Sequence, residues 1–122
     1  MCKVIETYIG KNKVRVADIK KKYLENVVDA AGKCDYIDRI IVFGSSTNSE
    51  CREESDIDLA IFGNVARGKC LTSKKYEDFL KQVYSYDDFG QSYDILYFKS
   101  GQKYRDSLIM NNIDLGELLY EA

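Results

Sequence analysis

The sequence predicts one small domain of the α/β or α+β class, in which helices pack against a central β-sheet. Short, nearly continuous apolar runs, typical of buried strands, alternate with segments whose apolar residues recur every three or four positions, typical of amphipathic helices. The chain has 122 residues, 45% of them hydrophobic. This length suits a single domain that buries a core without disulfides or a structural metal.

Two segments carry the apolar spacing of helices. The first is 16–31, with Gly32 placed to end it and an apolar stripe of Val16, Ile19, Tyr23, Val27 and Ala30. The second runs from Thr72 to Tyr86, and Thr72 and Ser73 are candidates for its N-terminal cap. Its stripe is interpreted as core or partner surface and consists of Tyr76, Phe79, Leu80, Val83 and Tyr84.

Three apolar runs predict buried strands, at Ile37–Phe43, Ile57–Phe62 and Asp94–Phe98. Each is too short for a helix, and the first is rich in β-branched residues. Residues 102–112 predict a further helix, and 115–120 a short closing strand or turn. The alternation of helices and strands indicates a layered domain with one sheet.

Composition excludes several classes of function. The chain contains no His, so a Ser-His-Asp triad, a Cys-His pair and an imidazole zinc site are all excluded. Acid–base chemistry must come from carboxylates, Lys, Tyr or Cys. The formal net charge of -2 and a pI near 5.2 make duplex nucleic acid an unsuitable partner.

The cysteines and the N-terminus predict a cytoplasmic protein. The four cysteines form no C-x-x-C pair, and we interpret them as reduced thiols: Cys2, Cys34, Cys51 and Cys70. The first residues lack the apolar run of a signal peptide, and no segment reaches the length of a membrane span. Residues 1–33 hold eight basic and four acidic groups. A solvated helix face explains this excess better than a phosphate or partner contact, although both remain open.

The strongest candidate for chemistry is the pair Asp56 and Asp58, at the start of the second predicted strand. Alternate side chains of a strand point to the same face, which places the two Cα atoms roughly 6 to 7 Å apart. Neighbouring carboxylates repel each other unless a cation lies between them. An all-oxygen donor set favours Mg²⁺ or Mn²⁺ over zinc.

Two further features extend this pair. Asp94 opens the third predicted strand, and it would reach the same metals if the second and third strands are neighbours, about 4.8 Å apart. Gly44 and Ser45 follow the first strand, where a glycine allows backbone N–H groups to approach a phosphate. Together these parts predict two-metal phosphoryl or nucleotidyl transfer, in which one carboxylate helps to activate the attacking hydroxyl.

The pattern Phe43-Gly44-Ser45, then Asp56-Ile57-Asp58-Leu59, then Asp94, resembles the signature of the polymerase-beta-like nucleotidyltransferase superfamily. The short length and the ending Gly116-Glu117-Leu118-Leu119-Tyr120-Glu121 resemble the minimal nucleotidyltransferase (MNT) proteins, including MNT antitoxins. The resemblance implies a small nucleotidyltransferase fold with a mixed central β-sheet flanked by α-helices. One domain would then cover 1–122, with a leading helix at 16–31, a catalytic core at 37–98 and a C-terminal helix and tail at 102–122.

The resemblance also implies roles for individual residues. Asp56 and Asp58 would bind two Mg²⁺ or Mn²⁺ ions, and Asp94 would be a third ligand or the base. Gly44 and Ser45, with Ser46 beside them, would hold the phosphates of ATP. The family's usual Arg-Ala-Arg-Gly after Gly-Ser is absent, and residues 46–49 read Ser-Thr-Asn-Ser. Arg52, in the same loop, is a candidate substitute for the missing basic groups.

The expected partner is a HEPN-type toxin, because some MNT proteins transfer AMP from ATP to a tyrosine of such a toxin and thereby silence it. Two alternatives remain open. The chain could be a non-catalytic antitoxin that acts by occlusion, or a small-molecule nucleotidyltransferase of the antibiotic-modifying type. The short chain leaves little room for a second domain to enclose a drug-sized acceptor, which ranks the last alternative lowest.

Overall fold

The structure is a computed structural model, and it describes residues 2–101 and 107–122. The strands are β1 (Val4–Ile9), β2 (Asn12–Ala17), β3 (Ile37–Phe43), β4 (Ile57–Gly63), β5 (Tyr93–Lys99) and β6 (Glu117–Glu121). The helices are α1 (Lys21–Ala31), α2 (Arg67–Leu71), α3 (Lys74–Ser85) and α4 (Ser107–Asp114). Three 3₁₀ turns, η1 (Asp18–Lys20), η2 (Gly44–Thr47) and η3 (Tyr86–Phe89), join these elements.

The centre of the fold is a four-stranded mixed sheet with the strand order β5-β4-β3-β6. Strand β3 is antiparallel to both β4 and β6, whereas β4 and β5 are parallel. The parallel pair requires a crossover, which α2 and α3 supply. This arrangement confirms the predicted fold class of a mixed sheet flanked by helices.

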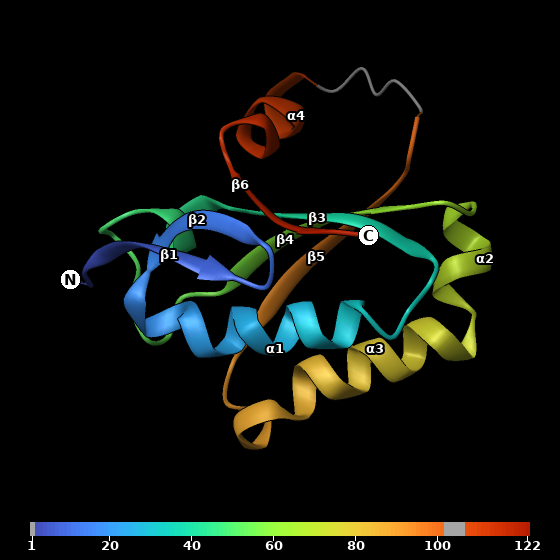
Figure 1. The fold of residues 1–122 in the computed structure, drawn as a ribbon, viewed down its shortest axis with the longest axis horizontal. Helices are drawn as coiled ribbons and strands as arrows, with labels where there is room; N and C mark the ends of the chain where they lie inside the picture. The colour runs from blue at the N-terminus through green and yellow to red at the C-terminus, as the bar shows by residue number, and fades with distance from the viewer. Residues whose placement is uncertain (1, 102–106) are drawn as a thin grey trace.

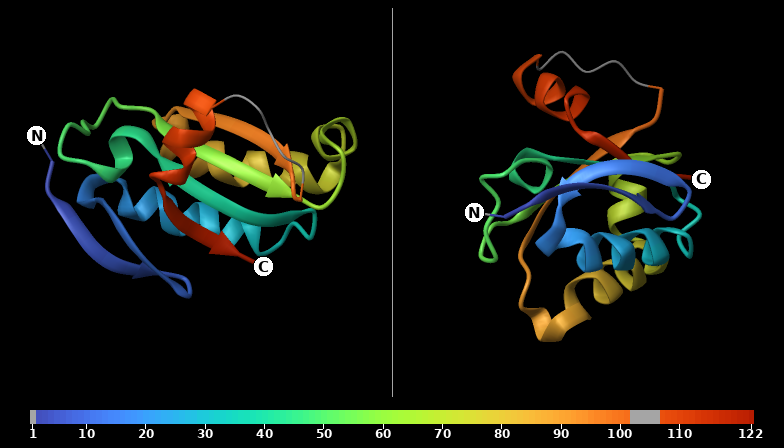
Figure 2. Two further views of the ribbon diagram at one scale, coloured as in Figure 1. Left: turned by 90° about the horizontal axis from the view of Figure 1, so that it is seen from above. Right: turned by 60° about the vertical axis from the view of Figure 1, so that its left-hand side comes forward.

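Helices cover both faces of the sheet. Figure 1 and Figure 2 show α1 and α3 on one face and α4 on the other. Side chains of a strand alternate between the faces, and the buried residues of β4 follow this rule. Leu59 and Ile61 join the main core beneath the sheet, together with Leu24 of α1, whereas Ala60 and Phe62 pack with Ile113 of α4.

The N-terminal hairpin of β1 and β2 is a correction to the sequence prediction, which extended the first helix back to residue 16. The strands pair antiparallel, with Val4 opposite Ala17 and Ile9 opposite Asn12. The hairpin lies alongside β6, as the left view of Figure 2 shows. Asn12 Nδ2 donates to the Leu119 carbonyl oxygen at 3.3 Å, and the Arg15 amide donates to Glu117 Oε1 at 2.7 Å.

Other predicted elements are present with small shifts in their ends. The predicted strands 37–43, 57–62 and 94–98 correspond to β3, β4 and β5, and 115–120 contains most of β6. The predicted helix 102–112 corresponds in part to α4, since 102–106 lie outside the described residues. The side chain of Ser73 caps α3 by accepting a hydrogen bond from the Tyr76 amide, which confirms one of the two cap candidates.

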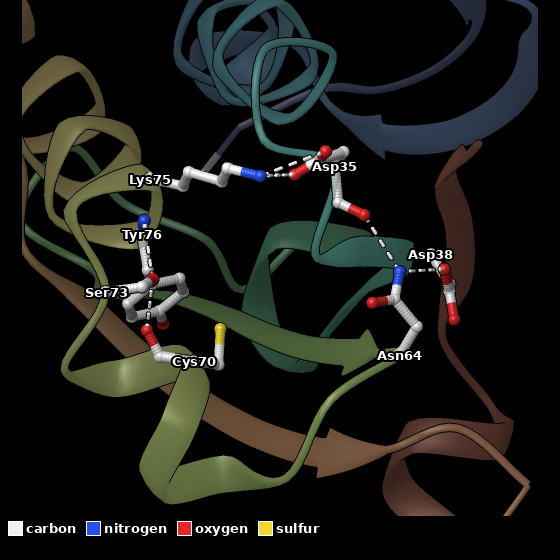
Figure 3. A network of polar contacts seen from close by, with 7 residues as sticks. All are labelled: Asp35, Asp38, Asn64, Cys70, Ser73, Lys75 and Tyr76. Atoms are coloured by element: carbon white, nitrogen blue, oxygen red, sulfur yellow. Dashed lines mark hydrogen bonds and ion pairs between the residues drawn. The ribbon is translucent and has the colours of Figure 1, made fainter.

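Polar contacts join the chain segments at the end of the sheet where β3 begins and β4 ends (Figure 3). Asn64 Nδ2 donates to the Asp35 carbonyl oxygen at 2.8 Å and to Asp38 Oδ1 at 2.9 Å. Lys75 of α3 forms an ion pair with Asp35 at 2.8 Å. The predicted site residues lie at the opposite end of the sheet, where β3 ends and β4 and β5 begin.

Within the described residues, no helix combines the length and the apolar content that a membrane span requires.

Candidate functional site

The parallel pairing of β4 and β5 brings two of the predicted carboxylates together. Asp58 and Asp94 are direct partners in the register of the two strands, so their side chains are neighbours on one face. Asp56 immediately precedes β4. By the alternation of the strand, Asp58 points to the same face as Ala60 and Phe62, the face that α4 covers farther along.

Gly44 lies directly against Asp58. Strand β3 ends with Phe43 opposite Asp58, and Gly44 then starts the turn η2 with a φ of +73°. A Cβ atom built on Gly44 would collide with Asp58 Oδ2. Only glycine combines this positive φ with so close an approach. The fold therefore places the Gly44 backbone in contact with the carboxylate of Asp58.

The electrostatics of Asp58 reflect this crowding. Asp58 is half-buried, whereas Asp56 and Asp94 are exposed. Burial raises the pKa of Asp58, and the negative charges of Asp94 and Asp56 raise it further. Among the described residues, none of the three carboxylates forms an ion pair with a basic side chain. The site thus concentrates negative charge without neutralising it.

A divalent cation fits the donor chemistry of this site. The side chains offer only carboxylate oxygens, which Mg²⁺ and Mn²⁺ prefer, and a cation would relieve the repulsion that raises the pKa of Asp58. However, no group of three or more Asp, Glu, Cys or His side chains in the described part of the chain is arranged so that it could hold a metal ion. The three aspartates interact through their charges without forming a three-ligand cluster.

The predicted phosphate loop is closed by side-chain and backbone hydrogen bonds within the loop. Thr47 Oγ1 donates to the Gly44 carbonyl oxygen at 2.8 Å, and the Asn48 amide donates to the Ser45 carbonyl oxygen at 3.1 Å. Ser45 is half-buried, but Ser46 is fully buried, and its hydroxyl has no hydrogen-bond partner among the described residues. A contact between Ser46 and a nucleotide would therefore need the backbone. Arg52 is exposed, on the loop that leads to β4.

Three residues lie near the site although the sequence does not predict them there: Lys20, Gln91 and Tyr84. Lys20 and Gln91 are buried, and Gln91 lies in the segment that precedes Asp94. Burial lowers the pKa of Lys20 below its ordinary value, and the nearby carboxylates of Asp56, Glu53 and Glu54 offset part of this shift. Lys20 is therefore not part of a solvated helix face, which corrects the favoured interpretation of the basic N-terminal segment for this residue.

Tyr84, near the end of α3, is the third. Burial raises its pKa, and the charges of Asp94 and Asp56 raise it further. Its apolar spacing with Tyr76 and Phe79 predicts core, and these two rings are indeed buried. Tyr84 itself is half-buried, and it lies close enough to Asp94 and Asp56 for their charges to raise its pKa. Helical periodicity does not reveal this proximity.

A sequence model of the family described as "Polymerase beta, Nucleotidyltransferase" matches residues 25–122. The chain belongs to this family. The match starts inside α1 and includes every strand of the central sheet and all three candidate aspartates. The hairpin β1–β2 and Lys20 precede it. A search of curated proteins finds no match to the chain.

Membership of the polymerase beta nucleotidyltransferase family supports nucleotidyl transfer as the class of reaction. It also agrees with the observed mixed sheet, whose β3–η2–β4 unit presents Gly44 against Asp58. The family match says nothing about the acceptor, the nucleotide base or the metal. Those assignments depend on the chemistry of the site itself.

Proposed function

We propose that this chain transfers AMP from ATP to a hydroxyl group of a protein acceptor, and that the acceptor is a HEPN-type toxin which the transfer silences. The proposal rests on one observation: Asp58 lies against the Gly44 backbone in a polymerase beta nucleotidyltransferase fold, with the charges of Asp94 and Asp56 close enough to raise its pKa and, among the described residues, no ion pair to any of the three. Retaining unpaired carboxylates side by side is costly to folding. A catalytic role that requires negative charge would explain why the fold keeps these carboxylates.

The reaction class assigns a task to each part of the site. Two Mg²⁺ or Mn²⁺ ions, when bound, would neutralise the triphosphate and polarise the α-phosphorus. Asp56 and Asp58 would hold these ions, with Asp94 as a further ligand or as the base. The Gly44–Ser45 backbone would orient the phosphates against Asp58.

The chemical step then balances as follows. The acceptor hydroxyl oxygen bonds to the α-phosphorus of ATP while the bond from that phosphorus to the bridging oxygen breaks. Pyrophosphate departs with the electron pair, and the hydroxyl proton passes to a carboxylate, for which Asp94 is the candidate. An exposed position suits this task, because Asp94 remains accessible to an acceptor that arrives from solvent.

The openness of the site favours a protein acceptor over a drug-sized molecule. Asp56 and Asp94 are exposed, and four pockets elsewhere in the described part of the chain are lined by other residues. A small acceptor needs walls that bury most of its surface. A protein acceptor brings its own surface and needs only access. ATP as donor also agrees with the cytoplasmic location that the sequence predicts.

The test is incubation of the purified protein with ATP and Mg²⁺, with and without the protein encoded beside it in the genome. Intact mass spectrometry would detect the gain of one AMP on the partner. The Asp56→Asn, Asp58→Asn double variant should fold but transfer nothing, because the site loses two carboxylates while the core keeps its packing. Asp114→Asn makes the same chemical change at an exposed position on α4 and should transfer normally.

Three outcomes would contradict the proposal. Transfer by the folded double variant would remove the carboxylate mechanism. A tight complex that forms equally well with the double variant, without any adduct, would instead assign the chain to the binding antitoxins that act by occlusion. An adduct on a small molecule but not on the partner would favour the antibiotic-type alternative.

A further inference from the structure

Lys20 is a buried cation that joins two chain segments of the candidate site. It stands at the end of η1, just before α1, and only 1% of its surface is exposed. Its Nζ donates to the carbonyl oxygens of Glu53 and Ser55 at 3.0 and 2.8 Å. It also donates to Gln91 Oε1 at 2.6 Å. All three protons of the ammonium group therefore have an acceptor.

Gln91 completes this arrangement from the other segment. It is 5% exposed, and its Nε2 donates to the carbonyl oxygens of Ser55 and Ser92 at 2.9 and 2.7 Å. The Ser55 carbonyl thus accepts from both Lys20 and Gln91. The Ile57 amide in turn donates to the Ser92 carbonyl oxygen at 3.0 Å, where the pairing of β4 with β5 begins.

The position of these bonds relative to the carboxylates is informative. Ser55 immediately precedes Asp56, and Ser92 is two residues before Asp94. Strands β4 and β5 are parallel and are connected only through the long crossover of α2 and α3. No tight turn can therefore fix their spacing at this end of the sheet. The bonds of Lys20 and Gln91 join the two segments just ahead of this pair of strands.

We propose that Lys20, together with Gln91, is a positioning residue: it fixes the segments that carry Asp56 and Asp94 relative to Asp58, and the binding of divalent cations in the proposed function depends on this placement. This rests on the proposed function, since it assigns a role within the same site. Neither residue needs to touch the nucleotide or a metal. Groups that orient metal ligands from behind typically change metal affinity by about 10- to 100-fold when they are removed.

The test is Mn²⁺ affinity, measured by calorimetry or by the spectrum of free Mn²⁺, together with the kcat and KM of transfer. Lys20→Met keeps the length of the side chain and removes the three donated bonds, while Ser55 keeps its bond from Gln91. We expect Mn²⁺ binding to weaken about tenfold or more and kcat to fall, with little change in the KM of the acceptor. Lys22→Met, an exposed lysine of α1, is the matched control and should behave as the wild type.

A second variant keeps the proposal falsifiable if Lys20→Met does not fold. Gln91→Met removes the two donations to Ser55 and Ser92 but leaves Lys20 with both of its carbonyl partners. It should also weaken Mn²⁺ binding, and it should speed hydrogen exchange of the Ile57 amide. A folded Lys20→Met or Gln91→Met protein with wild-type Mn²⁺ affinity and kcat would overturn the positioning role. A wild-type protein that neither binds Mn²⁺ nor transfers AMP would instead overturn the proposed function.

Discussion

Gly44 links backbone conformation to the chemistry of the site more directly than any other described residue. Its φ of +73° lies in the left-handed region, and its missing side chain gives Asp58 Oδ2 the space it occupies. A side chain here would disturb two things at once, the turn and the carboxylate. Gly101 has a φ of +82° as well, but a Cβ built there meets nothing within 4 Å. A substitution at Gly101 therefore tests the cost of the left-handed backbone alone, whereas one at Gly44 tests that cost together with the collision with Asp58.

Gly44→Ala should abolish transfer, or reduce it by at least tenfold, because the added methyl group displaces the Asp58 carboxylate. Gly101→Ala should impose a similar left-handed strain of about 1–2 kcal/mol and leave transfer intact. Thermal unfolding measures the backbone strain in each variant, and the AMP adduct on the acceptor measures transfer. Equal activity of the two variants would show that the contact of Gly44 with Asp58 is irrelevant to function.

The candidate site illustrates what the sequence can and cannot predict at this scale. Alternation along a strand depends on local spacing, so the sequence predicts that Asp58 and Asp94 are neighbours on the condition that their strands pair. The structure meets this condition, which local spacing alone does not determine. The role of Lys20 could not be predicted. Its partners are mainly backbone carbonyl groups of segments far away in the sequence, and carbonyl groups are present at every residue. Nothing in the run Lys20-Lys21-Lys22 shows which of the three points inward.

At the scale of elements, the predictions succeed where one pattern, either a continuous apolar run or a helical stripe, extends over a whole segment. Strands β3, β4 and β5 and helix α3 have such patterns, and all were predicted. The hairpin β1–β2 was missed because Val16 fits both the helical stripe that follows it and the strand alternation that precedes it. Val14 and Val16 are buried and Arg15 is exposed, which is the period of a strand. Gly10, with a φ of +60°, marks the turn.

Helix α3 offers a test of local stabilisation away from the site. Ser73 Oγ accepts a hydrogen bond from the Tyr76 amide at 3.2 Å, and Figure 3 shows this cap beside Cys70 and Lys75. Ser73→Ala should lower the free energy of unfolding by about 1 kcal/mol, since one amide at the helix start loses its acceptor. Denaturant titration measures the change.

The control for the cap is Ser85→Ala, at the exposed last position of the same helix. It removes the same hydroxyl where no N-terminal amide needs it, so stability should stay within about 0.5 kcal/mol of the wild type. Ser73→Ala should retain AMP transfer, because α3 begins at the end of the sheet opposite to the aspartates. A loss of activity in Ser73→Ala at temperatures where it is folded would contradict this separation.

At the scale of the whole molecule, the site is a place where function and stability oppose each other. Burial and the neighbouring charges of Asp94 and Asp56 raise the pKa of Asp58, so the folded chain binds that proton more tightly than the unfolded chain does. Stability therefore falls as pH rises from the ordinary Asp value of about 3.9 through the raised folded value. Above the folded pKa, the full penalty is present.

Asp58→Asn should consequently be more stable than the wild type at pH 7 to 8 in the absence of divalent cations, and the difference should vanish at acidic pH, where the wild-type carboxyl is protonated in both states. Thermal unfolding across pH measures this. Addition of Mn²⁺ should reverse the order, because a ligand that binds only the folded state raises its stability by RT ln(1 + [L]/Kd), and the variant loses a carboxylate from the binding site.

The same experiment distinguishes a functional carboxylate from one that is merely tolerated. Asp114→Asn, which changes an exposed carboxylate on α4, should shift the unfolding temperature little at any pH and should keep the response to Mn²⁺. If Asp58→Asn proves less stable than the wild type at neutral pH without metal, the repulsion among the three aspartates is not a cost. Their convergence would then need no bound cation to account for it, and the main physical argument for a metal at this site would fail.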